Sequence, residues 1–337
     1  MGTKDKTTRR LEAYNDVFAD IINVLVFNGE RRILEHDLLE VDTKSTFVAD
    51  DRGIRSQDRD IAKFWSVQKI RLALFGLENQ STPDPTMPLR IYSYNGASYK
   101  AQLLPPMPKT AEKTTPDVHA DPEGCAEPPT SEQQHYPVLT LVLYFGLKPW
   151  HTARTLYESV PVPDEMKPFI PDLPINLVEV AWLPDEVIDK FQSDFKVVAK
   201  FLKQLRLRED THLDMQDPAL SQPITHFLEL MQLMSAYSHD PRFESEAHPL
   251  PPMEERNMLA VLTRLEDQGR EEGKKEGKKE GRKEGRKEAS EHLNMLYANL
   301  FKVGRANDVQ RAVQDPEYLR QLMAEFGYPT DDEGQLT

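Results

Sequence analysis

Apolar positions along the chain predict an alternation of helix and strand. Over residues 13–27 apolar side chains return every three or four positions, which is the spacing of a helix buried on one face, and Asn28-Gly29 is a typical stop signal. The run IRLALFGL at 70–77 is apolar on both faces and predicts a buried strand, and residues 136–146 predict a second one. Shorter extended segments are expected at 36–42, 59–67 and 175–183.

The segment at 88–104, PLRIYSYNGASYKAQLL, carries two competing patterns. Asn95-Gly96 is suited to the two-residue turn of a β-hairpin. The same segment also has one helical face at 3-4-3-4 spacing, formed by Leu89, Tyr92, Gly96, Tyr99 and Leu103. Local signals alone favour the hairpin.

The rest of the chain is mostly helical in pattern. Residues 105–135 hold seven prolines and almost no apolar side chains, so we expect a disordered insertion there. Amphipathic patterns predict helices at 184–206 and 222–237. This order of elements predicts an α/β core with a helical C-terminal half.

A low-complexity segment, GREEGKKEGKKEGRKEGRKEA, places a glycine at every fourth residue from 269 to 285. As a helix it would gain about 0.2–0.5 kcal/mol from each Glu–Lys pair, whereas each glycine costs about 1 kcal/mol relative to alanine. A solvated charged helix or spacer is therefore favoured over a stripe for self-association or a DNA contact. The predicted divisions are a basic tail (1–10), a core (11–183), a helical extension (184–252), a charged repeat helix (253–302) and a C-terminal helix with a tail (303–337).

Composition limits the class of protein. Of the 337 residues, 39% are hydrophobic and 29% charged, no apolar run approaches the ~18 residues of a membrane span, and the first residues lack the apolar stretch of a secretory signal. The single cysteine, Cys125, excludes a disulfide framework, so we expect a cytoplasmic protein. The net charge is −14, so any DNA contact is expected from local basic patches, such as those in 1–10 and 269–288.

Common catalytic motifs are absent from the sequence: it has no G-x-S-x-G, no H-E-x-x-H, no phosphate-binding P-loop and no C-x₂-C pair. Carboxylates remain. Glu78 and Gln80 share one face at the end of the 70–80 strand, about 6–7 Å apart, and Asp58 or Asp60 could supply an upstream acid. Asp16 and Asp20 could add a third one from the first helix. Such oxygen ligands suit Mg²⁺, although ordinary strand-end polar residues have the same spacing.

Five segments, in order across about residues 11–240, resemble the recombination-promoting nuclease and transposase-like family, a branch of the PD-(D/E)XK nuclease superfamily. They are DVFADIINVLVFNGE, RDIAKFW, LFGLENQSTPDPTMPLRIYSYNGASYKAQL, YPVLTLVLYFGLKPW and LVEVAWLPDE, and the charged repeat is similar to that family's C-terminal repeats. The resemblance implies a restriction-endonuclease-like core, with a helix, a mixed central sheet and flanking helices. It also implies a helix after the Glu78 strand, in place of the hairpin at 87–103.

Carried over by resemblance, Asp60 and Glu78 take the places of the superfamily's two metal-binding acids, and Gln80 takes the place of its lysine. A glutamine can only hydrogen-bond, so either Lys69 or Lys63 supplies the missing cation or the site is slow. The implied activity is a Mg²⁺- or Mn²⁺-dependent DNA endonuclease linked to recombination. The alternative is a catalytically weak or inactive DNA-binding or scaffolding protein of the same fold, which forms a homo-oligomer through the 253–302 helix.

Overall fold

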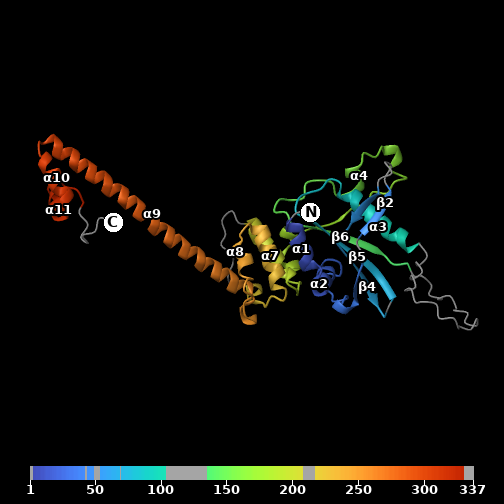
Figure 1. Cartoon of the computed structure of the whole chain (residues 1–337). Helices are drawn as coiled ribbons and strands as arrows, with labels where there is room; N and C mark the ends of the chain where they lie inside the picture. The colour runs from blue at the N-terminus through green and yellow to red at the C-terminus, as the bar shows by residue number, and fades with distance from the viewer. Residues whose placement is uncertain are drawn as a thin grey trace, which may run out of the picture. The chain divides into compact units, whose positions relative to one another are not determined.

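A computed structural model describes residues 3–41, 44–48, 54–68, 70–103, 135–207 and 217–329 (Figure 1). The chain forms two compact units, Met1–Val261 and Leu262–Thr337. The first unit is mixed α/β, as the apolar patterns predict, and it is built on a five-stranded mixed sheet. Among the described residues, none of the helices has both the length and the apolar character needed to cross a membrane.

The sheet has the order β1-β4-β5-β6-β7. Strand β4 pairs antiparallel with β1 and with β5, whereas β5 with β6 and β6 with β7 are parallel. These five strands confirm the five extended segments predicted from the sequence. A separate antiparallel pair, β2 with β3, was not predicted. The bounds are β1 Leu38–Glu40, β2 Lys44–Val48, β3 Ile54–Asp58, β4 Ile61–Val67, β5 Ile70–Gln80, β6 Val138–Tyr144 and β7 Asn176–Glu179.

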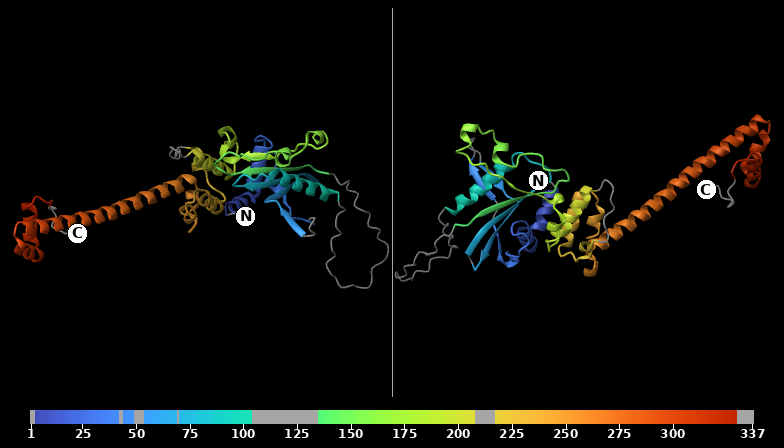
Figure 2. Two further views of the ribbon diagram at one scale, coloured as in Figure 1. Left: turned by 90° about the horizontal axis from the view of Figure 1, so that it is seen from above. Right: turned by 180° about the vertical axis from the view of Figure 1, so that it is seen from behind.

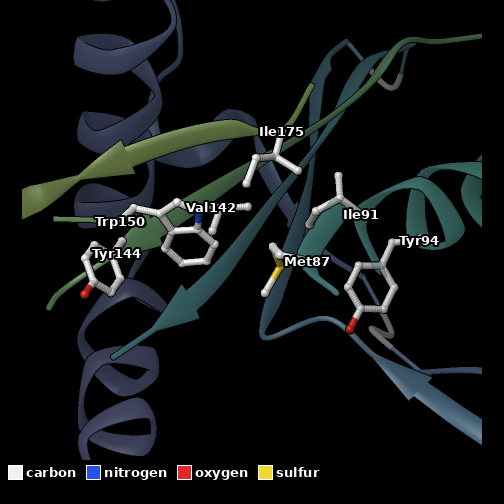
Figure 3. Close-up of a cluster of buried hydrophobic side chains, with 7 residues drawn as sticks. All are labelled: Met87, Ile91, Tyr94, Val142, Tyr144, Trp150 and Ile175. Atoms are coloured by element: carbon white, nitrogen blue, oxygen red, sulfur yellow. The ribbon is translucent and has the colours of Figure 1, made fainter. Parts of the chain in front are cut away.

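Helix α3 (Met87–Gln102) lies between the parallel strands β5 and β6, so the hairpin favoured by local signals is wrong and the helix implied by the resemblance is confirmed. The reason is topological, because parallel neighbours require a crossover that a hairpin cannot provide. Met87, Ile91 and Tyr94 point from the helix toward the sheet (Figure 3). They share a buried cluster with Val142, Tyr144, Trp150 and Ile175.

The opposite face of the sheet is covered by α1 (Thr3–Glu12) and α2 (Asn15–Leu25). Residues 1–10 were expected to be a basic tail, but the described residues from Thr3 onward form a helix instead. It is held because Thr8 and Leu11 are buried, and the Thr8 hydroxyl meets that of Tyr237 at 3.2 Å. Leu11 is the one apolar residue among the ten of α1, so the sequence pattern gave no sign of a buried face.

The helical extension is present but divided differently from the prediction. The expected helix at 184–206 is broken into α5 (Asp185–Ile188) and α6 (Phe195–Leu207). Between them, the backbone amides of Gln192 and Ser193 donate to the carboxylate of Asp20 on α2, at 2.9 and 2.7 Å. Because these two amides donate to Asp20, they do not form the backbone hydrogen bonds that would continue α5. The remaining elements of this unit are η1 Glu35–Asp37, α4 Leu156–Ser159, η2 Asp164–Met166, η3 Val180–Trp182, η4 Pro218–Ser221, α7 Phe227–Ser238, α8 Arg242–Ser245 and η5 Met253–Glu255.

The glycine-rich repeat is helical and lies within α9 (Met258–Lys302), which Figure 2 shows as one long helix. The side chains of the repeat are exposed. In the second unit, the end of α9 packs with α10 (Ala306–Gln314) and α11 (Pro316–Glu325) around a small apolar core. The core includes Leu296, Leu300, Ala312, Leu319, Leu322 and Met323. The predicted disordered insertion at 105–135 lies outside the described residues, apart from its last residue.

Candidate active site

The candidate site lies at the end of β5, where three polar residues follow an apolar strand. Side chains alternate across the sheet, so Glu78 and Gln80 face α3 and Asn79 faces α1. Glu78 and Asn79 are only 1% and 3% exposed, whereas Gln80 is partly exposed. A strand end thus delivers two buried polar groups to opposite faces of the same sheet.

Asp60 lies beside them, as the sequence predicted. It directly precedes β4, whose first pair with β5 is Ile61 with Leu77, so Asp60 comes next to Glu78. Its carboxylate accepts a hydrogen bond of 2.8 Å from the backbone amide of Asn79. The antiparallel register therefore joins two acids that are 18 positions apart in the chain.

On the α3 face, Glu78 contacts the guanidinium of Arg90, whose Nη1 is also 3.0 Å from Asp84. Arg90 Nη2 further donates to the hydroxyl of Tyr94 at 3.2 Å. The side chain of Arg90 remains 34% exposed, whereas that of Glu78 is almost fully buried. Arg90 therefore connects the buried carboxylate with the surface, a role that sequence reasoning missed.

A second guanidinium lies under this face. Arg59 is buried, its Nη2 donates to Asn95 at 3.0 Å, and its guanidinium is 5.6 Å from the ring centre of Tyr94. Gly76 makes room for it, because a Cβ at that position would be 3.1 Å from the Arg59 side chain. Glycine within a strand often marks such a close approach, and this was the one signal in the sequence that could have pointed to Arg59.

On the α1 face, Asn79 Nδ2 donates to Glu12 at 2.6 Å. Glu12 is fully buried, and its Oε1 has no hydrogen-bond partner within the described part of the chain; the same holds for Asn79 Oδ1 and Glu78 Oε2. Unpartnered buried oxygens are rare in proteins and mark sites of function or strain. No spacing in the sequence indicated Glu12, because it is 67 residues away from Asn79.

Burial dominates the electrostatics of the three acids. Burial, and after it the charge of Asp60, raises the pKa of Glu78 to about 8 despite Arg90 and Arg59. Burial also raises the pKa of Asp60 and of Glu12, although each accepts a hydrogen bond from Asn79. For Arg59, burial lowers the pKa to about 10. Three acids that are difficult to ionise together attract protons or a cation.

The other residues predicted for the site lie elsewhere. The carboxylate of Asp16 is 2.9 Å from His226, and Asp20 accepts the bonds from the α5–α6 turn. Lys63 is 1% exposed and donates to Ala13 and Asn15 at the junction of α1 and α2. Lys69 and the side chain of Asp58 lie outside the described residues. The structure thus brings Asp60 next to Glu78, places Gln80 two residues further along the same strand, and gives Asp16, Asp20 and Lys63 other partners.

The oxygen ligands suit a hard divalent cation held by few protein groups. Among the described residues, no three His, Cys, Asp or Glu side chains are grouped so that they could enclose a metal ion. Mg²⁺ needs less, because one or two carboxylates commonly hold it while water and substrate phosphate fill the other positions. Asp60 and Glu78 provide that pair, and Glu78 Oε2 is unpartnered. The residues present therefore fit Mg²⁺ or Mn²⁺, and they do not fit an ion enclosed by protein ligands alone.

Comparisons with protein-family models, with curated proteins and with solved structures find no match for this chain.

The raised pKa of Glu78 leads to a prediction about stability in metal-free buffer. The pKa of about 8 in the folded state exceeds the ordinary 4.5, so the folded protein binds a proton that the unfolded chain has lost. Stability must then fall as pH rises from about 4.5 to 8, since fewer protons are bound in the unfolded state over this range. Glu12 and Asp60 act in the same direction. We expect a thermal midpoint that is several degrees lower at pH 8.5 than at pH 5.5.

The measurement is thermal unfolding in EDTA, followed by the fluorescence of Trp65, Trp150 and Trp182, which all lie in the first unit. Glu78→Gln should flatten the pH dependence. Glu165→Gln, which removes an exposed carboxyl from the same unit, should keep the wild-type slope. If the midpoint of the wild type rises with pH over this range, the buried acids are ionised and the electrostatic description is wrong.

Proposed function

We propose that this chain is a metal-dependent DNA endonuclease of the recombination-promoting nuclease and transposase-like type. The observation that carries the proposal is the adjacency of Asp60 and Glu78 on neighbouring strands, joined through the hydrogen bond from the Asn79 amide to Asp60. Two buried carboxylates at a strand end, followed by a helix, also match what the resemblance implies for a PD-(D/E)XK site. The restriction-endonuclease-like fold and the cytoplasmic location belong to the same proposal.

In this proposal Asp60 and Glu78 hold Mg²⁺ or Mn²⁺, and the Glu12 carboxyl group, held by Asn79, lies on the α1 side of the site. The bound ion would polarise the scissile phosphate and lower the pKa of a water molecule. Gln80 lies on the same strand face as Glu78 and orients the attacking water by hydrogen bonding. Asn79 holds Asp60 through its backbone and Glu12 through its side chain, so it positions both acids at once.

Gln80 replaces a lysine, so a cation from elsewhere is needed beside the phosphate. Lys63 is occupied by Ala13 and Asn15. Arg90 is better placed, because it contacts Glu78 and is one-third exposed. Burial alone would lower the pKa of Arg90, but contact with Glu78 outweighs it and the pKa lies above the ordinary value. We therefore assign the role of the missing lysine to Arg90.

A second candidate function is a DNA-binding or scaffolding protein with little catalysis, assembled as a homo-oligomer through α9. The observation that favours it is the same substitution, because Gln80 cannot neutralise charge on a phosphate. The helix α9 is exposed along the repeat. Apart from chain neighbours and the helix's own backbone, no described atom lies within 4 Å of a Cβ added at Gly273, Gly277, Gly281 or Gly285. DNA held by surface lysines and arginines would dissociate as salt rises in either case.

Incubation of the full chain with supercoiled plasmid tests the choice. We expect nicking in about 5 mM Mg²⁺ or Mn²⁺, a concentration at which Mg²⁺ sites are commonly filled. We expect no nicking in EDTA, and binding of the plasmid without nicking in Ca²⁺. The same ions should raise the thermal midpoint more at pH 8.5 than at pH 6, because metal binding requires deprotonated ligands. Plasmid binding with no cleavage under any of these conditions would favour the scaffolding alternative, and the absence of both binding and cleavage would contradict a DNA partner.

A further inference from the structure

The outward face of α3 is apolar although it faces away from the core. Met87, Ile91 and Tyr94 occupy the sheet side of this helix (Figure 3). The exposed side carries the residues that the sequence placed on one helical face, and their exposed fractions are 39% for Leu89, 54% for Tyr92, 47% for Tyr99 and 74% for Leu103. Tyr99 is fixed there, because its hydroxyl accepts a hydrogen bond from the Val138 amide at 3.1 Å.

Gly96 lies in the middle of this face, and nothing in the described structure requires a glycine. Its backbone is helical, and apart from its chain neighbours and the backbone of α3 itself no described atom lies within 4 Å of a Cβ added there. A glycine inside a helix is unfavourable relative to alanine. The absence of a side chain at this position is explained if another backbone approaches it from outside, which is the usual use of glycine at helix crossings.

The order of residues along the face is nearly the same in both directions. From Leu89 the stripe runs Leu, Tyr, Gly, Tyr, Leu, with spacings of 3, 4, 3 and 4 residues, and Gly96 is its centre. A two-fold dimer needs such a surface, because both copies use the same face: if residue i of one copy contacts residue j of the other, then residue j of the first contacts residue i of the second. A partner of unrelated sequence would place no such demand on the order.

We propose that α3 pairs antiparallel with α3 of a second copy of this chain, crossing at Gly96. In that register Leu89 of each copy lies against Leu103 of its partner copy. Tyr92 comes next to Lys100, a cation that can lie over its ring, and Tyr99 comes next to the small Ser93. The α3 helix has no acidic residue, so neither Arg90 nor Lys100 meets a carboxylate on the α3 helix of the other copy, and specificity depends on shape.

DNA is a weaker match for the same surface. Its affinity for proteins derives mainly from contacts between basic side chains and phosphates. On this helix Arg90 is held by Glu78 and Asp84, which leaves Lys100 as the basic residue on the outward side. Leu89 and Leu103 at the two ends have no role in binding phosphates, whereas they meet each other in the dimer.

The dimer should be weak and should tighten with salt. A single helix pair buries less than the roughly 1,200 Å² that stable interfaces exceed, so we expect a dissociation constant in the micromolar range. Each copy carries a net charge of −14, so screening by salt reduces repulsion and favours the pair. Pairing through the charged repeat of α9 would respond in the opposite way.

The inference is independent of nuclease activity, although a two-fold pair would direct two equivalent sites at strands of opposite polarity.

Gly96→Ala in the full chain tests the proposal, with sedimentation velocity measured from about 1 to 100 µM, the range that spans micromolar dissociation constants. The substitution should raise the dissociation constant of the dimer at least tenfold. At 1 µM it should leave the thermal midpoint unchanged or raise it by a few degrees, because alanine favours the helix. Gly281→Ala, the matched control in α9, should leave the dimer intact. A dimer lost in Gly281→Ala and kept in Gly96→Ala would overturn the proposal.

A charge exchange provides the second test. Leu89→Glu alone should abolish the dimer, and Leu89→Glu/Leu103→Lys should restore it, because each new glutamate then faces a lysine of the other copy. Within one chain these positions are fourteen residues apart, about 21 Å along the helix, so they cannot compensate for each other. If the wild type forms no dimer at 100 µM, the face is free and the pairing is refuted. If Gly96→Ala lowers the thermal midpoint at 1 µM, the face is covered by the chain itself and the pairing is refuted as well. A loss of plasmid binding with unchanged sedimentation would assign the face to DNA and refute it equally.

Discussion

Replacing Asp60 by asparagine or Glu78 by glutamine will each lower Mg²⁺-dependent nicking of plasmid by about 100-fold or more, because each change removes one of the two charges proposed to hold the ion. Both substitutions preserve size and hydrogen bonding. An asparagine at 60 still offers an oxygen to the Asn79 amide, and a glutamine at 78 still offers one to Arg90. The loss should therefore appear in the rate and in the response to metal, with little change in the fold.

The measurement is a time course of supercoiled plasmid conversion, at saturating and at limiting Mg²⁺. Asp16→Asn is the matched control, because it removes the same kind of charge from a carboxylate that contacts His226 instead of the site. It should keep the rate within about threefold, in the range of substitutions outside catalytic contacts. Equal nicking by the wild type and by the Asp60→Asn/Glu78→Gln double variant would mean that the two carboxylates do not hold the catalytic ion.

Replacing Gly146 by alanine will destabilise the first unit by about 1–3 kcal/mol, the usual cost of forcing an extra group into a packed core. A Cβ at this position would overlap the hydroxyl end of the Tyr144 ring. That ring cannot easily move, because it is 2% exposed and packs edge-on against Trp150, with ring centres 5.2 Å apart. For a unit of this size the thermal midpoint should fall by several degrees.

Tryptophan fluorescence during thermal unfolding reports this unit and measures the effect. Gly96→Ala is the control, since the same methyl group is added there in open space and should not destabilise the protein at low concentration. The same added methyl group is thus expected to lower the thermal midpoint at position 146 and to leave it unchanged or raise it at position 96. A midpoint in Gly146→Ala equal to that of the wild type would mean that Tyr144 has room to move and that the packing around Trp150 is looser than described.

The sequence by itself was sufficient for the five strands of the main sheet, though not for the β2–β3 pair, and for one half of the site. Strands β5 and β6 are central in the sheet, so both of their faces are buried and the apolar runs stand out without any knowledge of neighbours. The adjacency of Asp60 and Glu78 was also predictable, because two strands joined by a short turn pair antiparallel and bring the start of one to the end of the next.

Local sequence patterns could not decide between helix and hairpin at 87–102; the resemblance implied the helix, and the tertiary structure shows why it forms. Asn95-Gly96 is a strong local turn signal, but the burial of Met87, Ile91 and Tyr94 against the parallel strands outweighs it. The 3-4-3-4 spacing from Leu89 to Leu103 correctly indicated a helix, but it did not indicate that this face of the helix would be exposed. Both faces of α3 have apolar residues, so which of them meets the sheet depends on the crossover between β5 and β6.

The other half of the site was decided by packing alone. Glu12 belongs to a helix whose polar pattern resembles a solvated tail, and it reaches Asn79 because α1 lies against the sheet. Arg59 and Arg90 converge on Glu78 from a strand start and a helix, and no spacing relates the three. Local periodicity records which side of an element is buried. The contact between Glu12 and Asn79, 67 residues apart, depends on how the helix and the sheet pack, which the pattern of residues along the chain does not encode.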